Sequence, residues 1–203
     1  QSSTSTIFQV TADGRNEHEE TMTIEIDEVV GNGTKTTEVS GQKKTITIKD
    51  GDPLPTVTIE ALPVSIEEEG GVSTITARLN KASGRDVVVN LKSTGSAETG
   101  SVLKDTDYKM DTKISIAEGG TFGSVTLSAM TDLLDEHDEK VTVEIESVEF
   151  LSTSTAPQSV VVTIVDNDEL PQVSFTAGSP QVLEGATTTI TVTLNPVSGR
   201  TVT

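Results

Sequence analysis

Two dense acidic loops are the residues with the clearest capacity for chemistry. Residues 132–139 read DLLDEHDE, in which five of eight side chains are carboxylates, and residues 13–20 read DGRNEHEE. Asp132 follows Asp13 by 119 positions, and an alternating, strand-like run follows each loop at once. Carboxylate oxygens are the ligands that hard divalent cations prefer. The duplicated loop therefore predicts a repeated, oxygen-rich cation site at the entrance to a strand.

The overall composition is acidic and poor in aromatic residues. The 203 residues include 32 Asp and Glu against 14 Lys and Arg, a formal net charge of −18 at pH 7. This charge argues against nucleic acid and anionic membrane surfaces as partners. The absence of cysteine excludes disulfides and thiolate metal sites. No apolar run approaches the roughly 20 residues that span a bilayer, so we expect no membrane insertion in this segment.

Catalytic motifs do not stand out. The chain has no Trp and one Tyr, so it lacks the aromatic platforms that usually accompany a carboxylate pair in a glycosidase cleft. No Ser/His/Asp or Cys/His arrangement is evident. His18 and His137 occupy equivalent places among carboxylates, and we interpret them as exposed side chains with raised proton affinity rather than ligands. We predict that the protein is not an enzyme.

A second duplication, with an offset of 115 residues, extends the repeat. It pairs Glu69-Gly70, residues 74–80 and Ser83-Gly84-Arg85 with Glu184-Gly185, residues 189–195 and Ser198-Gly199-Arg200. A period of this size suits a tandem array of β-domains. We predict that residues 1–52 are the C-terminal part of one unit, residues 53–168 a complete unit, and residues 169–203 the N-terminal part of a further unit. Arg85 and Arg200 are predicted to serve the turn or to pair with a carboxylate.

Period-two alternation marks about seven strands in the complete unit, and no stretch has a helical period. The strands are expected around residues 57–59, 74–79, 87–91, 114–116, 125–127, 141–145 and 160–164. This pattern predicts an all-β fold, an antiparallel β-sandwich of immunoglobulin-like size.

Loops at one end of such a sandwich lie close together, so four acidic places can converge. They are Glu69, Asp107, the loop at 132–139, and Asp166 with Asp168. Calcium takes six to eight oxygen ligands, whereas zinc prefers nitrogen and sulfur. We therefore interpret the cluster as a Ca²⁺ site. The alternative is a solvated acidic surface that keeps the protein soluble.

The order of these motifs resembles the Calx-β domain, a family first described in sodium–calcium exchangers and widespread in large extracellular and adhesive proteins. The residues that carry the resemblance are Ser83-Gly84-Arg85, Thr106-Asp107-Tyr108, Glu118-Gly119-Gly120-Thr121, residues 132–139 and Asp166-Asn167-Asp168. The resemblance implies tandem seven-stranded immunoglobulin-like sandwiches that bind several Ca²⁺ ions at their distal loops.

Carried over by position, the resemblance implies two sets of calcium ligands. In the complete unit they are Glu69, Asp107, Asp132, Glu136, Asp166 and Asp168, with Glu139 as a further ligand; in the first unit they are Asp13, Glu17, Asp50 and Asp52. The third unit contains only Glu184. Thr131 stands where calcium-binding members often have Asp, and Asn167 replaces the central Asp of the closing motif. We therefore expect fewer or weaker ions than in more acidic relatives.

The expected function is a structural or adhesive segment of a long extracellular repeat protein, stiffened by Ca²⁺ at its domain ends. The expected partners are Ca²⁺, neighbouring repeats and a cell-surface or matrix ligand. Two alternatives remain: a regulatory calcium-sensing module, and a subunit of a filament assembled by head-to-tail strand complementation. A window of a longer array is favoured over the filament, because the two partial units together fall short of a whole domain.

Overall fold

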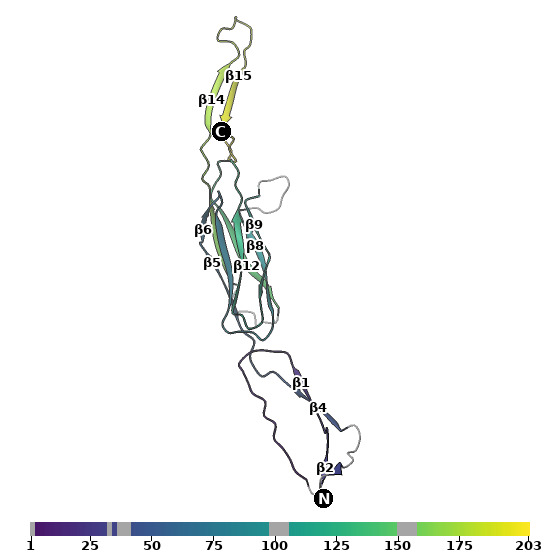
Figure 1. Cartoon of the computed structure of the whole chain (residues 1–203). Coiled ribbons are helices and arrows are strands. Elements are labelled where there is room, and N and C mark those ends of the chain that lie inside the picture. The colour runs from purple at the N-terminus through teal and green to yellow at the C-terminus, as the bar shows by residue number, and fades with distance from the viewer. Residues whose placement is uncertain (1–2, 32–33, 36–41, 98–105, 150–157) are drawn as a thin grey trace.

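The computed structural model describes residues 3–31, 34–35, 42–97, 106–149 and 158–203, and Figure 1 shows them as three parts that follow one another end to end. We name these parts by the predicted boundaries: the N-terminal segment (1–52), the middle unit (53–168) and the C-terminal segment (169–203). The boundaries themselves stay a prediction. All regular structure in the described ranges is β-strand, so these ranges contain no helix long and apolar enough to cross a membrane.

The middle unit is a sandwich of two sheets. One sheet has the order β10-β8-β12-β13-β6 and the other the order β5-β7-β11-β9. Neighbouring strands are antiparallel except for the parallel pair β6 and β13. The strands are β5 (Val57–Leu62), β6 (Ser65–Glu67), β7 (Val72–Leu79), β8 (Val87–Gly95), β9 (Tyr108–Met110), β10 (Lys113–Ile116), β11 (Phe122–Ala129), β12 (Glu139–Val148) and β13 (Ser159–Val165).

The predicted all-β fold of immunoglobulin type is confirmed, with two short strands added. All seven expected strands are present, and β6 and β9 come in addition. After Leu62 the chain leaves the sheet of β5, and β6 joins the opposite sheet beside β13. Each added strand has only three residues, too few to show an alternation in the sequence.

The core of the middle unit lies between the two sheets and is almost entirely aliphatic. Ile75 and Leu127 from one sheet and Val141 and Val143 from the other have no exposed surface. Full burial of such a side chain contributes roughly 1.5–3 kcal/mol. Tyr108 on β9 is also buried, as a packing residue should be.

The two flanking segments consist of strand pairs with open faces. In the N-terminal segment β1 (Glu20–Glu25) pairs with β4 (Lys43–Ile48) and β2 (Val30–Gly31) with β3 (Thr34–Lys35); in the C-terminal segment β14 (Gln172–Ala177) pairs with β15 (Ile190–Asn195). Apolar side chains of these pairs, such as Ile24 and Phe175, are largely exposed. A two-stranded pair alone is only marginally stable, so the middle unit provides the packed core of the described chain.

Backbone contacts tie several chain segments together at one end of the middle unit, which we call its acidic end (Glu68, Asp107, residues 132–139, Asp166 and Asp168). The Glu68 amide donates to the Val165 carbonyl at 3.0 Å, and the Met130 amide donates to the Asp107 carbonyl at 2.8 Å. The strand ends and loops that carry the acidic residues are therefore held side by side.

Candidate cation site at the acidic end of the middle unit

Three carboxylates meet at the acidic end. Glu68, Asp166 and Asp168 each offer an oxygen atom, and these oxygens lie within 4.8 Å of one another. Glu68 directly follows β6, and Asp166 directly follows β13. The two strands run parallel, with Glu67 opposite Val165. Since parallel strands end at the same edge of a sheet, the residues that follow them are brought together by the pairing.

Glu68 is the buried member of this group, with 7% of its surface exposed. Its Oε1 accepts a hydrogen bond from the Asp132 amide at 3.0 Å. The pKa of Glu68 is raised to about 7, first by burial and then by the nearby charges of Asp132, Asp168 and Asp166, against the opposing effect of that amide. The pKa of Asp168 is also raised, first by desolvation and then by the charge of Asp166. The folded chain thus concentrates negative charge where water screens it poorly.

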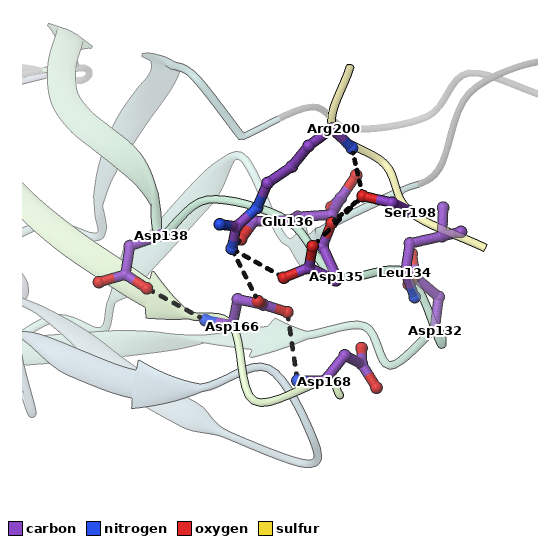
Figure 2. A network of polar contacts seen from close by, with 9 residues as sticks. All are labelled: Asp132, Leu134, Asp135, Glu136, Asp138, Asp166, Asp168, Ser198 and Arg200. Atoms are coloured by element: carbon purple, nitrogen blue, oxygen red, sulfur yellow. Dashed lines mark hydrogen bonds and ion pairs between the residues drawn. The ribbon is translucent and has the colours of Figure 1, made fainter. Parts of the chain in front are cut away.

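Side-chain to backbone hydrogen bonds shape the loops around the cluster. Asp132 Oδ1 accepts from the Leu134 amide at 2.8 Å, and Asp166 Oδ1 accepts from the Asp168 amide at 3.3 Å. The Asp166 amide in turn donates to Asp138 Oδ1 at 3.3 Å (Figure 2). Asp side chains favour such local bonds to the backbone two residues on. These carboxylates therefore set the conformation of the loops.

A small hollow beside the cluster gathers most of the remaining predicted ligands. It is lined by Glu68, Asp107, Glu136, His137, Glu139, Ile164 and Asp166. The structure therefore brings Asp107, Glu136, Glu139 and Asp166 to one place from three separate stretches of chain. Asp132 adjoins the same group through its bond to Glu68. That these residues bind a metal ion stays a prediction. His137 has an exposed side chain.

Glu69 stands apart from the hollow, and its neighbour Glu68 takes the inner position. Glu69 is exposed, whereas Ile66 and Glu68 are both buried. Side chains of a strand alternate between faces, so Glu68 shares the inward face with Ile66. Counting in steps of two from Ile66 would have selected Glu68 from the sequence, had β6 been recognised as a strand.

The N-terminal segment repeats the local structure of the acidic loop. Asp13 Oδ1 accepts from the Arg15 amide at 2.9 Å, and Asp50 Oδ1 accepts from the Asp52 amide at 3.0 Å. The four predicted ligands here line one open hollow: Asp13, Glu17, Asp50 and Asp52.

The carboxylates of this hollow have pKa values that move in opposite directions. The charge of Asp13 raises the pKa of Glu17, with desolvation as the next cause. The pKa of Asp50 is lowered, mainly by the Asp52 amide and also by the Glu17 amide and the charge of Arg85. Asp50 therefore stays ionised more readily than Glu17, and its position is fixed by the donors around it.

Asp135 is a buried carboxylate that is absent from the predicted ligand set. It is 3% exposed, and its Oδ1 lies 3.0 Å from Arg200 Nη2. Figure 2 shows Arg200 pointing from the C-terminal segment toward Asp135 and Asp166, and the distance from its Nη2 to Asp166 Oδ2 is 3.5 Å. Ser198 Oγ donates to Asp135 Oδ2 at 3.2 Å. The predicted pairing of Arg200 with a carboxylate is confirmed, and its partners belong to the middle unit.

No protein-family model matches the chain, and no curated protein sequence matches it significantly. Several solved structures resemble it weakly. The apo form of the Calx CBD1 domain has 18% identity and a TM-score of 0.43, over 57% of this chain and 99% of that one. CBD12 from CALX1.2 has 17% identity and a TM-score of 0.46, over 60% and 49%. A two-domain protein of unknown function from Bacteroides fragilis has 11% identity and a TM-score of 0.39, over 63% and 56%.

Proposed function

We propose that the acidic end of the middle unit binds Ca²⁺. The observation that carries this proposal is the meeting of Glu68, Asp166 and Asp168 within 4.8 Å, with Glu68 buried. Like charges at such distances repel strongly where water is partly excluded. A divalent cation removes this repulsion and uses the same oxygens as ligands.

The donor set favours calcium over other common divalent ions. Calcium takes about six to eight oxygens from flexible carboxylates and carbonyls, whereas magnesium keeps several of its waters in a strict octahedron. Zinc prefers nitrogen and sulfur ligands, and among the residues lining the hollow only His137 offers a side-chain nitrogen. We assign Glu68, Asp166 and Asp168 as the primary ligands. Asp107, Asp132, Glu136 and Glu139 are the nearest further donors.

The position of the site supports a role in stiffening the chain. Asp168 is followed within four residues by β14, so an ion held by Asp166 and Asp168 restrains the start of the connection. We propose that the protein is a structural segment of an extracellular repeat array in which Ca²⁺ rigidifies the junctions. An adhesive role toward a cell-surface or matrix ligand belongs to the same proposal.

Small-angle scattering with Ca²⁺ and with chelator tests the stiffening. The expected result is a longer, narrower distribution of interatomic distances with Ca²⁺ and a broader one with chelator. Asp111→Asn, at an exposed carboxylate between β9 and β10, is the control and should respond to Ca²⁺ in shape and in Tm as the wild type does. A discrete rearrangement between two equally compact shapes favours a calcium sensor instead. If neither shape nor Tm responds to Ca²⁺, both proposals are wrong.

A filament subunit would have to be the 21.3 kDa chain itself. The intact mass of the natural protein tests this alternative. A mass far above 21.3 kDa rules the filament out and leaves the repeat array.

A further inference from the structure

The same contact joins neighbouring parts of the chain at two places. A Ser-Gly-Arg turn that follows β7 touches the acidic loop of the N-terminal segment, and an identical turn that follows β15 touches the acidic loop of the middle unit. In the first contact the Gly84 amide donates to the Asn16 carbonyl at 3.0 Å. In the second the Gly199 amide donates to the Asp135 carbonyl at 3.2 Å. Asn16 and Asp135 hold the same place in their loops.

The arginines repeat the correspondence. Arg85 Nη2 donates to the Glu17 carbonyl, and Arg200 Nη2 donates to the Glu136 carbonyl. These two acceptors are also equivalent loop positions. Each turn therefore makes a pair of hydrogen bonds with the backbone of two successive residues in the facing loop, and both pairs recur with the repeat.

Glycine lets the turn approach the facing loop closely. A Cβ atom at Gly199 would lie 2.5 Å from Oε1 and 2.8 Å from Cγ of Glu136, and one at Gly84 would overlap Cγ of Glu17 and lie 3.1 Å from the Asn16 carbonyl oxygen. Neither glycine is among those with positive φ. The presence of glycine at these two positions is thus explained by packing between the two parts of the chain and not by backbone conformation.

The turn is fixed within its own unit before it meets the loop. In the middle unit Ser83 is 2% exposed, its Oγ accepts from the Arg85 amide at 3.1 Å, and its carbonyl accepts from the Gly119 amide at 2.8 Å. Arg200 and Ser198 repeat the first of these bonds at 3.0 Å. A rigid turn loses little conformational freedom on docking.

Charge differs between the two contacts while their shape is kept. At the second, Arg200 forms ion pairs with Asp135 and Asp166, both of which belong to the acidic end (Figure 2). At the first, Asn16 replaces the aspartate, and its Nδ2 donates to the Asp52 carbonyl at 2.9 Å and to the Asp50 carboxylate. The feature common to both is the docking of glycine and arginine on the loop backbone, which needs no metal ion.

We propose that the Ser-Gly-Arg turn is a docking element that fastens each unit to the acidic loop of the unit before it, independently of bound metal. Its partner is the backbone of an acidic loop of the same repeat type. The guanidinium adds a fixed positive charge beside the carboxylates of the loop. The stiffness of the array then has a permanent component beside the calcium-dependent one proposed above.

Amide exchange of Gly84, measured by NMR on the full 203-residue chain in excess chelator, tests the proposal. Gly84 belongs to the packed middle unit, but its acceptor belongs to the N-terminal segment. We expect Gly84 to be protected in the wild type. Arg85→Gln should speed its exchange about tenfold, since a charge-assisted hydrogen bond across the contact is lost. Arg78→Gln, which removes an exposed arginine of β7, should leave it unchanged.

Two further measurements keep the outcome unambiguous. Gly84→Ala should loosen the contact without changing charge, which is read from faster exchange of the amide at position 84, the one that faces the Asn16 carbonyl. The amides of Val89 and Val143 report that the sandwich stays folded. The proposal is overturned if Gly84 of the wild type exchanges at the rate of an unprotected amide, or if its protection appears only with Ca²⁺. It is also overturned if Gly84 exchanges at the same rate in Arg85→Gln and in the wild type. Protection in chelator combined with no binding of Ca²⁺ refutes the proposed function alone.

Discussion

Replacing Glu68 by Gln should stabilise the ion-free protein at pH 8 and weaken the binding of Ca²⁺. Glutamine keeps the shape of the side chain and an oxygen that can accept the hydrogen bond of the Asp132 amide. It removes a charge that is buried among the carboxylates of Asp132, Asp166 and Asp168. This substitution therefore shows separately how far the Glu68 charge destabilises the ion-free protein and how far it strengthens the binding of Ca²⁺.

The pKa of Glu68 gives the sign and the size of the effect. Its value is raised from 4.5 to about 7, so the folded protein binds the proton more tightly than the unfolded chain does. The contribution of Glu68 to the free energy of unfolding of the ion-free protein is therefore most favourable below pH 4.5. It falls as the pH rises toward 7 and stays low above pH 7. Each unit of pKa corresponds to about 1.4 kcal/mol. Allowing for screening by water at the open side of the cluster, we expect on the order of 1–2 kcal/mol at pH 8.

Tyr108 provides the assay. It is the one tyrosine of a chain without tryptophan, and it is buried in the middle unit, so intrinsic fluorescence reports the unfolding of that unit. Urea unfolding in chelator should show Glu68→Gln more stable than wild type at pH 8 and equal to it near pH 4.5. Glu60→Gln, at an exposed carboxylate on β5, is the control. The reasoning is refuted if Glu68→Gln is the less stable protein at pH 8, or if wild type gains no stability relative to the variant on acidification.

Four further outcomes are expected. Glu69→Gln should weaken Ca²⁺ binding less than Glu68→Gln, because Glu69 is exposed; isothermal titration that ranks them in reverse contradicts the assigned position. The Ca²⁺ affinity of the wild type should fall by up to about tenfold per pH unit below pH 7, since the ion displaces the Glu68 proton; an affinity that does not change between pH 7 and pH 5 excludes this ligand. Leu127→Ala should destabilise the middle unit by about 2–5 kcal/mol, measured by Tyr108 fluorescence, whereas Leu133→Ala at an exposed position should change stability by less than about 0.5 kcal/mol. Gly199→Ala should raise the exchange rate of the amide at position 199, which faces the Asp135 carbonyl, and leave β12 amides unchanged; equal rates would show that the turn is not packed against the loop.

Much of the sandwich could be predicted because its strands alternate regularly. In β7 the inward residues Ile75, Ala77 and Leu79 are separated by polar ones, and the structure buries that face. The three residues of β6 contain one apolar side chain between two polar ones, a pattern also typical of loops. Their strand conformation depends on pairing with β13, about 100 positions away in sequence, which local periodicity does not report.

The convergence of acidic loops could be predicted from topology, whereas the inner details could not. Asp107 precedes β9 in one sheet and Asp166 follows β13 in the other, and both line the same hollow at one end of the sandwich. Glu68, rather than Glu69, shares the inward face because it lies two residues after Ile66, and β6 is too short to reveal this alternation in the sequence. The ion pair of Asp135 with Arg200 crosses between parts of the chain. Repeats within a sequence reveal equivalent residues but not which of them face each other across a junction.

Isothermal titration of the 203-residue chain with Ca²⁺ at pH 7.5 tests the central claim most directly. The account predicts saturable binding in the wild type and in Glu60→Gln. It predicts affinity at least about tenfold lower in Glu68→Gln and in Asp166→Asn, because each variant loses a charged oxygen ligand. Absence of binding in the wild type, or equal affinity in all four proteins, would contradict the assignment of this acidic end as a calcium site.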